Sequence, residues 1–125
     1  MKIGISATYA FLAVSYIARN KDKKRIVSQT ISEKYDIPLE YLRSVLVHLV
    51  RFGILRSKRG PNGGFTLLRP ANKITMLDII EATEGPLTNG TMEEFAQGDR
   101  FTSKIDKVYE QAARSLKNAL KAIKL

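Results

Sequence analysis

The sequence predicts a mainly α-helical fold with a small β-hairpin wing, that is, a winged helix-turn-helix domain followed by a long C-terminal dimerisation helix. Apolar residues recur at helical spacing along most of the 125 residues. Two short alternating segments flank the glycine-rich stretch "RGPNGGF" (59–65), and an apolar stripe follows near the C-terminal end. The expected layout is a winged helix-turn-helix domain at 1–85, with the helix-turn-helix at 28–52 and the wing at 54–69, then an acidic loop at 86–101 and the dimerisation helix at 102–125.

Serines mark the expected starts of the first two helices. The first helix runs from Ser6, a candidate N-cap, to Arg19, and the charged stretch "RNKDKKR" (19–25) ends it as a solvated break. The second helix occupies 28–35, with Ser28 as its N-cap. Each is expected to bury one apolar face in a single modest core.

A tight turn joins the second helix to a third. Asp36 tolerates the left-handed conformation that such a turn needs, and Pro38 suits the first turn of a new helix because its missing N–H costs nothing there. The third helix is expected from about Leu39 to Phe52, with Gly53 at its C-terminal cap. This pattern is typical of a helix-turn-helix, whose second helix enters the major groove of DNA. The predicted core face of the third helix comprises Leu42, Val45, Leu46, Leu49 and Phe52.

The glycine-rich stretch is predicted to be the tip of a hairpin. The segments "ILRSKR" (54–59) and "FTLLR" (65–69) alternate as strands, the glycines allow a sharp turn, and Pro61 stiffens it. A P-loop is excluded because no Lys-Ser/Thr follows the glycines and the next segment is strand-like. A slim basic tip suits a DNA minor groove, and an ordinary tight hairpin is the alternative.

The C-terminal part is predicted to contain two more helices. Thr75 and Asp78 have capping-box spacing at the start of a helix over 75–82, and Ser103 and Asp106 repeat that spacing before the last helix. The last helix carries a stripe too apolar to face water alone, with charged flanks that suit two crossing helices, so a homodimer is expected. The predicted dimerisation stripe comprises Ile105, Val108, Ala112, Leu116, Ala119 and Ile123.

The charge is strongly uneven along the chain. Residues 1–75 hold 14 Lys and Arg against 4 Asp and Glu, residues 76–99 hold 6 acids and no Lys or Arg, and residues 100–125 hold 7 basic against 2 acidic residues. The net charge is +9. A basic N-terminal half indicates a polyanionic partner, either nucleic acid or an anionic membrane surface, and the alternative is that the charge serves solubility only.

Several function classes are disfavoured by composition. There is no cysteine and only one histidine, His48, so a disulfide framework, a thiolate metal site and a Cys nucleophile are excluded, and a histidine metal site within one chain is not expected. No apolar run is long enough to cross a bilayer. No nucleophile–base pair or paired-carboxylate motif stands out. We therefore expect a soluble cytoplasmic protein that is not an enzyme and has no cofactor.

The polar face of the third helix is the candidate reader of DNA bases. Arg43 can pair bidentately with guanine, and Glu40 can accept a hydrogen bond from cytosine N4. The start of the preceding helix offers hydroxyls and backbone N–H groups to a phosphate. The candidate DNA-binding residues are Ser28, Gln29, Thr30, Glu40, Tyr41, Arg43, Ser44, Arg51, Lys58, Arg59 and Pro61.

The segment "ISEKYDIPLEYLRSVLVHLVRFGILRSKRGPNGGFTL" (31–67) resembles the core of the Rrf-two family of bacterial winged-helix repressors and activators, which includes the regulators IscR and NsrR. The stretch "ANKITMLDIIEATEG" (71–85) is similar to the segment that follows the wing in that family. The resemblance implies a homodimer, built largely by a long C-terminal helix crossing its twin, that binds a pseudo-palindromic double-stranded operator. By position, Tyr41 and Arg43 occupy recognition-helix contact sites, and Arg59 occupies the wing arginine that enters the minor groove.

The chain departs from that family where many relatives ligate an iron–sulfur cluster through three cysteines. Here the segment is "LTNGTMEEFAQGDR" (87–100), and Asp, Glu and Ser are poor substitutes for soft thiolates. Glu93, Glu94 and Asp99 could hold a divalent cation, with a solvated acidic loop as the alternative. The signal is then an unknown small-molecule effector, or there is none. Arg43 also replaces an acid of the iron–sulfur regulator, so that regulator's operator is not carried over.

Two rival functions remain at this point. The first is a protein-interaction module in which the winged helix docks another protein and the apolar last helix provides a binding surface for it. The second is an amphipathic binder of membrane surfaces, although the stretch 103–125 is poor in the aromatic anchors that such helices favour.

Overall fold

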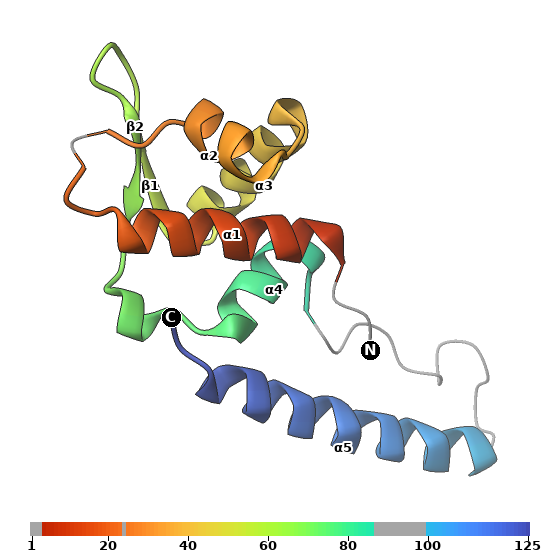
Figure 1. The fold of residues 1–125 in the computed structure, drawn as a ribbon. Coiled ribbons are helices and arrows are strands. Elements are labelled where there is room, and N and C mark those ends of the chain that lie inside the picture. The colour runs from red at the N-terminus through yellow and green to blue at the C-terminus, as the bar shows by residue number, and fades with distance from the viewer. Residues whose placement is uncertain (1–3, 24, 87–99) are drawn as a thin grey trace.

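The computed structural model describes residues 4–23, 25–86 and 100–125, and it consists of helices with one two-stranded antiparallel hairpin that projects from one edge (Figure 1). The predicted mainly α-helical class with a β-hairpin wing is confirmed. Figure 1 shows α1 running across the middle, with the hairpin and the α2–α3 pair on one side of it and α4 and α5 on the other. The elements are α1 (Ile5–Arg19), α2 (Ser28–Tyr35), α3 (Leu39–Arg51), β1 (Leu55–Lys58), β2 (Gly64–Leu67), η1 (Ala71–Lys73), α4 (Met76–Glu84) and α5 (Arg100–Ala122).

The serine caps predicted for the first two helices are wrong. The N-cap of α1 is Gly4 and that of α2 is Val27, and neither helix has a side-chain cap. The Ser6 hydroxyl is instead hydrogen-bonded to the hydroxyl of Tyr41, 2.6 Å away. Ser28 is the first residue inside α2, because the extended backbone of Val27 already starts the helix. Both helices therefore start one or two residues earlier than the serine caps predicted, because a possible cap does not prevent an alternative start upstream.

The predicted turn between α2 and α3 is confirmed. Asp36 adopts the left-handed conformation, with φ 53° and ψ 49°. Pro38 is the N-cap of α3, and its carbonyl accepts the N–H of Leu42 at 2.9 Å. Between them, Ile37 is buried and its N–H donates to the Ser32 carbonyl at 3.0 Å. This buried anchor holds the two helices at a constant angle.

The predicted core face of α3 is correct except at its end. Leu42, Val45, Leu46 and Leu49 are buried, whereas 57% of the Phe52 surface is exposed. Gly53, at φ 74°, reverses the chain after α3, and its N–H donates to the Val50 carbonyl while that of Ile54 donates to Leu49. Ile54 is fully buried in the core, whereas Phe52 is not.

The hairpin is anchored to the core at its base. Leu55 pairs with Leu67 at the inner end and Lys58 pairs with Gly64 at the outer end. The chain just before α2 runs along β2, so that the Phe65 N–H donates to the Ile26 carbonyl at 2.8 Å. Ile26 is buried in the same core as α1 and α3. The base of the hairpin is thus held from both sides.

A second apolar cluster joins α1, α4 and α5. Buried Ala7, Leu77, Ile80 and Leu120 come together in it, with Leu116 packed at the edge.

The predicted capping box at the start of α4 is confirmed. The side chains of Thr75 and Asp78 each accept the other's backbone N–H, at 3.1 and 2.9 Å. After α5 the chain returns to α4, where the Met76 N–H donates to the Ile123 carbonyl at 2.9 Å and the Leu125 N–H donates to that of Ile74 at 3.1 Å.

The last helix starts earlier than predicted. It begins at Arg100, so Ser103 lies inside it and is not its N-cap. Residues 100–102 contain no Gly or Pro that would stop a helix from extending upstream of the capping-box spacing. The acidic residues Glu93, Glu94 and Asp99 lie outside the described residues. Within the described part of the chain, no helix is both long and apolar enough to span a bilayer.

Candidate nucleic-acid interface

The outer face of α3 is fully available to a partner. Glu40, Arg43, Ser44, Val47 and Arg51 are all exposed and lie opposite the buried face of the helix. This separation follows from the amphipathic pattern, since the apolar residues recur every three or four positions and leave the intervening ones to solvent. The helix therefore presents an ordered row of polar groups that the core holds in place.

Arg43 and Glu40 are paired with each other in the isolated chain. The guanidinium of Arg43 donates to Glu40 Oε1 at 2.6 Å, and the two side chains are 56% and 86% exposed. An ion pair at such exposure contributes at most about 1 kcal/mol. Arg43 can therefore exchange this partner for a guanine edge at little cost, while Glu40 holds the guanidinium close to the helix before binding.

Tyr41 is shared between the outer face and the interior of the domain. Its hydroxyl bonds to Ser6, as described above, and its ring packs edge-on against Tyr9 with 5.3 Å between centroids. It is nevertheless 40% exposed. Tyr41 thus ties the start of α3 to the start of α1, a structural role that helical spacing alone did not indicate.

The start of α2 lies beside α3. Gln29 and Thr30 are exposed and Ser28 is half-buried. The amide of Gln29 donates to Glu33 Oε1 at 3.1 Å, along the same exposed face of α2. Because the first N–H groups of a helix have no partner within it, this end of α2 is suited to a phosphate oxygen.

The hairpin tip is narrow, basic and rigid. Lys58, Arg59 and Pro61 are exposed. The tip spans 59–63 and is closed by a bond from the Gly63 N–H to the Gly60 carbonyl, 2.8 Å long. A Cβ on Gly63 would lie 2.3 Å from the carbonyl oxygen of Lys58, so only glycine fits there. Gly60, at φ 99°, also adopts a conformation that other residues avoid.

One residue that sequence reasoning missed holds this tip in place. Arg25 Nε donates to the carbonyl of Gly63 at 2.8 Å, from 38 positions away in the sequence. The stretch 19–25 was expected to be a solvated break; α1 does end at Arg19 and Arg25 is exposed, but the hydrogen bond to Gly63 was not foreseen. The apolar Ile26–Val27 pair that follows was the only local sign that the chain returns to the core here.

The hairpin tip and α3 lie on the same side of α1. Figure 1 shows both on the side that is turned away from α5. The Leu68 N–H donates to the Ile54 carbonyl at 3.0 Å, which joins the base of the hairpin directly to the end of α3. A helix and a hairpin fixed side by side in this way define the winged helix-turn-helix class of DNA-binding fold.

The chain belongs to the Rrf2 family. The model of that family, described as an iron-dependent transcriptional regulator, matches residues 4–125. The family resemblance noted in the sequence is therefore confirmed. A family of transcriptional regulators is not an enzyme class.

Individual relatives agree with this assignment. The chain is 38% identical over 86 residues to the HTH-type transcriptional regulator IscR of Cereibacter sphaeroides, an alignment covering 67% of this chain and 56% of that protein. The chain spans about half the length of the curated relatives that it matches. Among solved structures, CymR, the global cysteine regulator of B. subtilis, has a TM-score of 0.80 at 20% identity, covering 99% of this chain and 92% of that one. The IscR of T. potens has a TM-score of 0.77 at 24% identity, with 99% and 82% covered. At these identities the two structures show the shared fold.

The residues of this chain do not fit a thiolate-ligated iron–sulfur cluster. An iron–sulfur cluster needs thiolates, and the sequence has no cysteine and a single histidine. Among the described residues, no three His, Cys, Asp or Glu side chains lie close enough to hold a metal ion. The metal-ligating side chains of this chain are therefore nitrogen and oxygen donors, and they include no thiolate.

Proposed function

We propose that this protein is a homodimeric, sequence-specific transcriptional regulator that inserts α3 into the major groove and the wing into the adjacent minor groove. The observation that carries this is the fixed juxtaposition of the exposed face of α3 with the basic tip at 59–63. The candidate contacts are the polar residues of α3, the start of α2 and the wing tip. In this proposal Arg43 and Glu40 contact base edges, and Arg59 enters the minor groove.

The proposed dimer uses the part of α5 that its own chain leaves uncovered. Leu120 packs in the α1–α4–α5 cluster and Ala113 is buried, whereas Ile105 and Val108 are 36% and 67% exposed. Ile123 was predicted on the last helix, but α5 ends at Ala122, so Ile123 lies just after it and is 51% exposed. Ala112 and Ala119 are exposed as well. Of the predicted stripe, Leu116 alone packs within the chain, at the edge of the α1–α4–α5 cluster. The helix therefore has two apolar faces, and the outer one suits a second copy related by two-fold symmetry.

Two-fold symmetry would match a pseudo-palindromic operator. Each subunit would present one recognition helix and one wing to a half-site, and the two subunits would act on the bacterial chromosome in the cytoplasm. Repression is the simplest outcome, because a bound dimer occludes the DNA that it covers. The regulator would act without an iron–sulfur cluster, for the reason of donor chemistry given above.

The test is selection of bound fragments from genomic DNA, followed by gel shift on the selected fragment between 50 and 200 mM salt. If about six phosphates are contacted, affinity should fall by roughly a thousandfold over that range. A random duplex of equal length should bind at least a hundredfold more weakly at the higher salt. No enrichment and a flat salt response would instead support the protein-interaction module, whose partner would not be DNA.

A further inference from the structure

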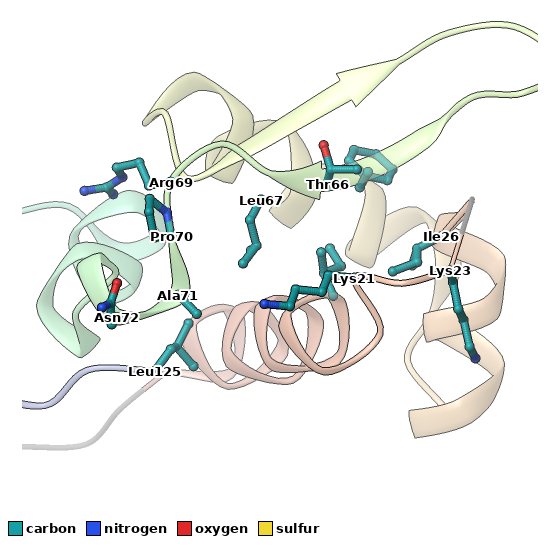
Figure 2. A pocket seen from close by; sticks show the side chains of 12 residues that line it. Lys21, Lys23, Ile26, Thr66, Leu67, Arg69, Pro70, Ala71, Asn72 and Leu125 are labelled. Atoms are coloured by element: carbon teal, nitrogen blue, oxygen red, sulfur yellow. The ribbon is translucent and has the colours of Figure 1, made fainter.

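A cavity of about 630 Å³ opens at the base of the wing (Figure 2). Its walls come from the end of α1, strand β2, the segment through η1, and the C-terminal residues after α5. This volume lies within the range of small-molecule sites in proteins. The apolar part of the lining consists mainly of Ile17, Ile26, Phe65, Leu67 and Leu125.

The charged side chains of the lining are all positive. Lys21, Lys23 and Arg69 line the cavity, and no Asp or Glu side chain does. Arg69 is paired with Asp78 at 3.6 Å, and the Lys23 ammonium donates to the Tyr16 hydroxyl at 3.4 Å. Among the described residues, Lys21 has no ion-pair partner, and Figure 2 shows its side chain reaching into the space between Leu67 and Leu125.

We propose that this cavity binds a small organic anion with an apolar body, such as an aryl carboxylate, and that this ligand is the effector. An apolar body would be buried against Ile17, Leu67 and their neighbours, while its anionic group would stay at the rim beside Lys21. A purely apolar ligand would leave the cation unused, and a fully polar anion would leave the apolar walls in contact with water.

The position of the cavity links it to the wing. Residues 65–67 of β2 form one wall, and Ile26, which accepts the Phe65 N–H, forms the next. The opposite side includes Leu125, in the segment that follows α5. An occupant that presses these walls apart would tilt the wing relative to α3. This regulatory step rests on the proposed DNA-binding function, whereas ligand binding itself does not.

The binding test compares two fluorescent probes that differ by one charge. 8-Anilinonaphthalene-1-sulfonate is an anion with an apolar body, and N-phenyl-1-naphthylamine has the same rings without the sulfonate. Lys21→Gln should weaken the anionic probe by about fivefold, as for an exposed ion pair, and leave the neutral probe unchanged. Lys73→Gln, an exposed lysine outside the cavity lining, is the charge-matched control and should change neither.

A second variant fills the space without altering charge. Ala71→Trp should weaken both probes by at least tenfold, and a circular dichroism melt checks its fold. The proposal would be overturned if neither Lys21→Gln nor Ala71→Trp weakened probe binding, or if the wild type did not bind the anionic probe. A gel shift with the selected DNA fragment separates ligand binding from DNA regulation. If the wild type binds no DNA but the probes respond to the variants as stated, the regulatory function fails and the binding site stands. If the wild type binds DNA, the anionic probe should change the protein concentration at half-maximal DNA binding for the wild type and leave that of Ala71→Trp unchanged.

Discussion

The guanidinium of Arg25 is hydrogen-bonded to the backbone carbonyl of Gly63 at 2.8 Å, which ties the loop before α2 to the tip of the wing. Because a two-stranded hairpin is only marginally stable by itself, we expect this hydrogen bond to help hold the direction in which the tip points. The wing is therefore positioned by a residue that need not touch DNA.

Replacing Arg25 by lysine tests this brace separately from its charge. Lysine keeps the positive charge but lacks the Nε donor, so Arg25→Lys should weaken binding to the selected operator by two- to tenfold, the equivalent of one lost hydrogen bond of about 0.5–1.5 kcal/mol. The salt slope in a gel shift should not change, because the number of cations is the same. An unaltered affinity would show that the wing holds its direction without Arg25.

Gly63→Ala should disrupt the tip itself. The new methyl would lie 2.3 Å from the Lys58 carbonyl oxygen and 2.8 Å from that of Gly60, and both are backbone atoms that cannot rotate away. Overpacking of this kind costs about 1–3 kcal/mol, which urea unfolding can measure. The neighbouring Asn62 is exposed, so Asn62→Ala is the control. Equal stability of the two variants would contradict the close approach.

Arg59→Ala tests the proposed contact in the minor groove. The potential there is most negative over A·T tracts, so the variant should lose the most affinity on operators with A·T-rich flanks and little on G·C-rich ones. The control is Lys34→Ala, which removes an exposed cation of α2 that is outside the proposed contacts. Binding curves on matched duplexes measure the preference, and a preference that survives in Arg59→Ala would discredit this contact.

The two roles of Tyr41 can be separated by a pair of variants. Tyr41→Phe and Ser6→Ala both remove the 2.6 Å hydrogen bond between α3 and α1, so each should lower unfolding free energy by about 0.5–1.5 kcal/mol. Only Tyr41→Phe also removes a hydroxyl that could reach a phosphate. If Tyr41 contacts DNA, operator affinity falls further in Tyr41→Phe than in Ser6→Ala, and equal affinities would restrict Tyr41 to its structural role.

Val108→Glu should break the proposed dimer. Val108 is 67% exposed on the outer face of α5, and a carboxylate buried at a symmetric interface would be unpaired. The dimer dissociation constant, measured by sedimentation equilibrium, should rise by more than tenfold. Gln111→Glu makes the same charge change at another exposed position of α5. An equal effect of both variants would point to general charge repulsion, and a monomeric wild type would refute the dimer.

Several local features could be predicted from the sequence because nearby residues decide them. Asp36 favours the left-handed turn, Gly53 ends α3, and the Thr75–Asp78 pair caps α4 through atoms three residues apart. The candidate DNA-binding face of α3 was likewise predictable, since periodicity alone separates its exposed from its buried side. The predicted starts at Ser6, Ser28 and Ser103 failed because a possible cap does not prevent an alternative start upstream.

The sequence by itself thus indicated the family, through the resemblance of 31–67 and 71–85 to it. It also determined the order of the helices, the hairpin and the polar surface of α3, because these depend on spacing within one or two turns. Only the tertiary structure decided that Arg25 braces Gly63, that Ile54 and not Phe52 closes the core, and that α5 divides its apolar residues between two faces. It also brought Lys21 and Leu125 into the lining of one cavity. Such pairings join residues far apart in the chain, and they arise from how whole elements pack, for which no short stretch of sequence carries a signal.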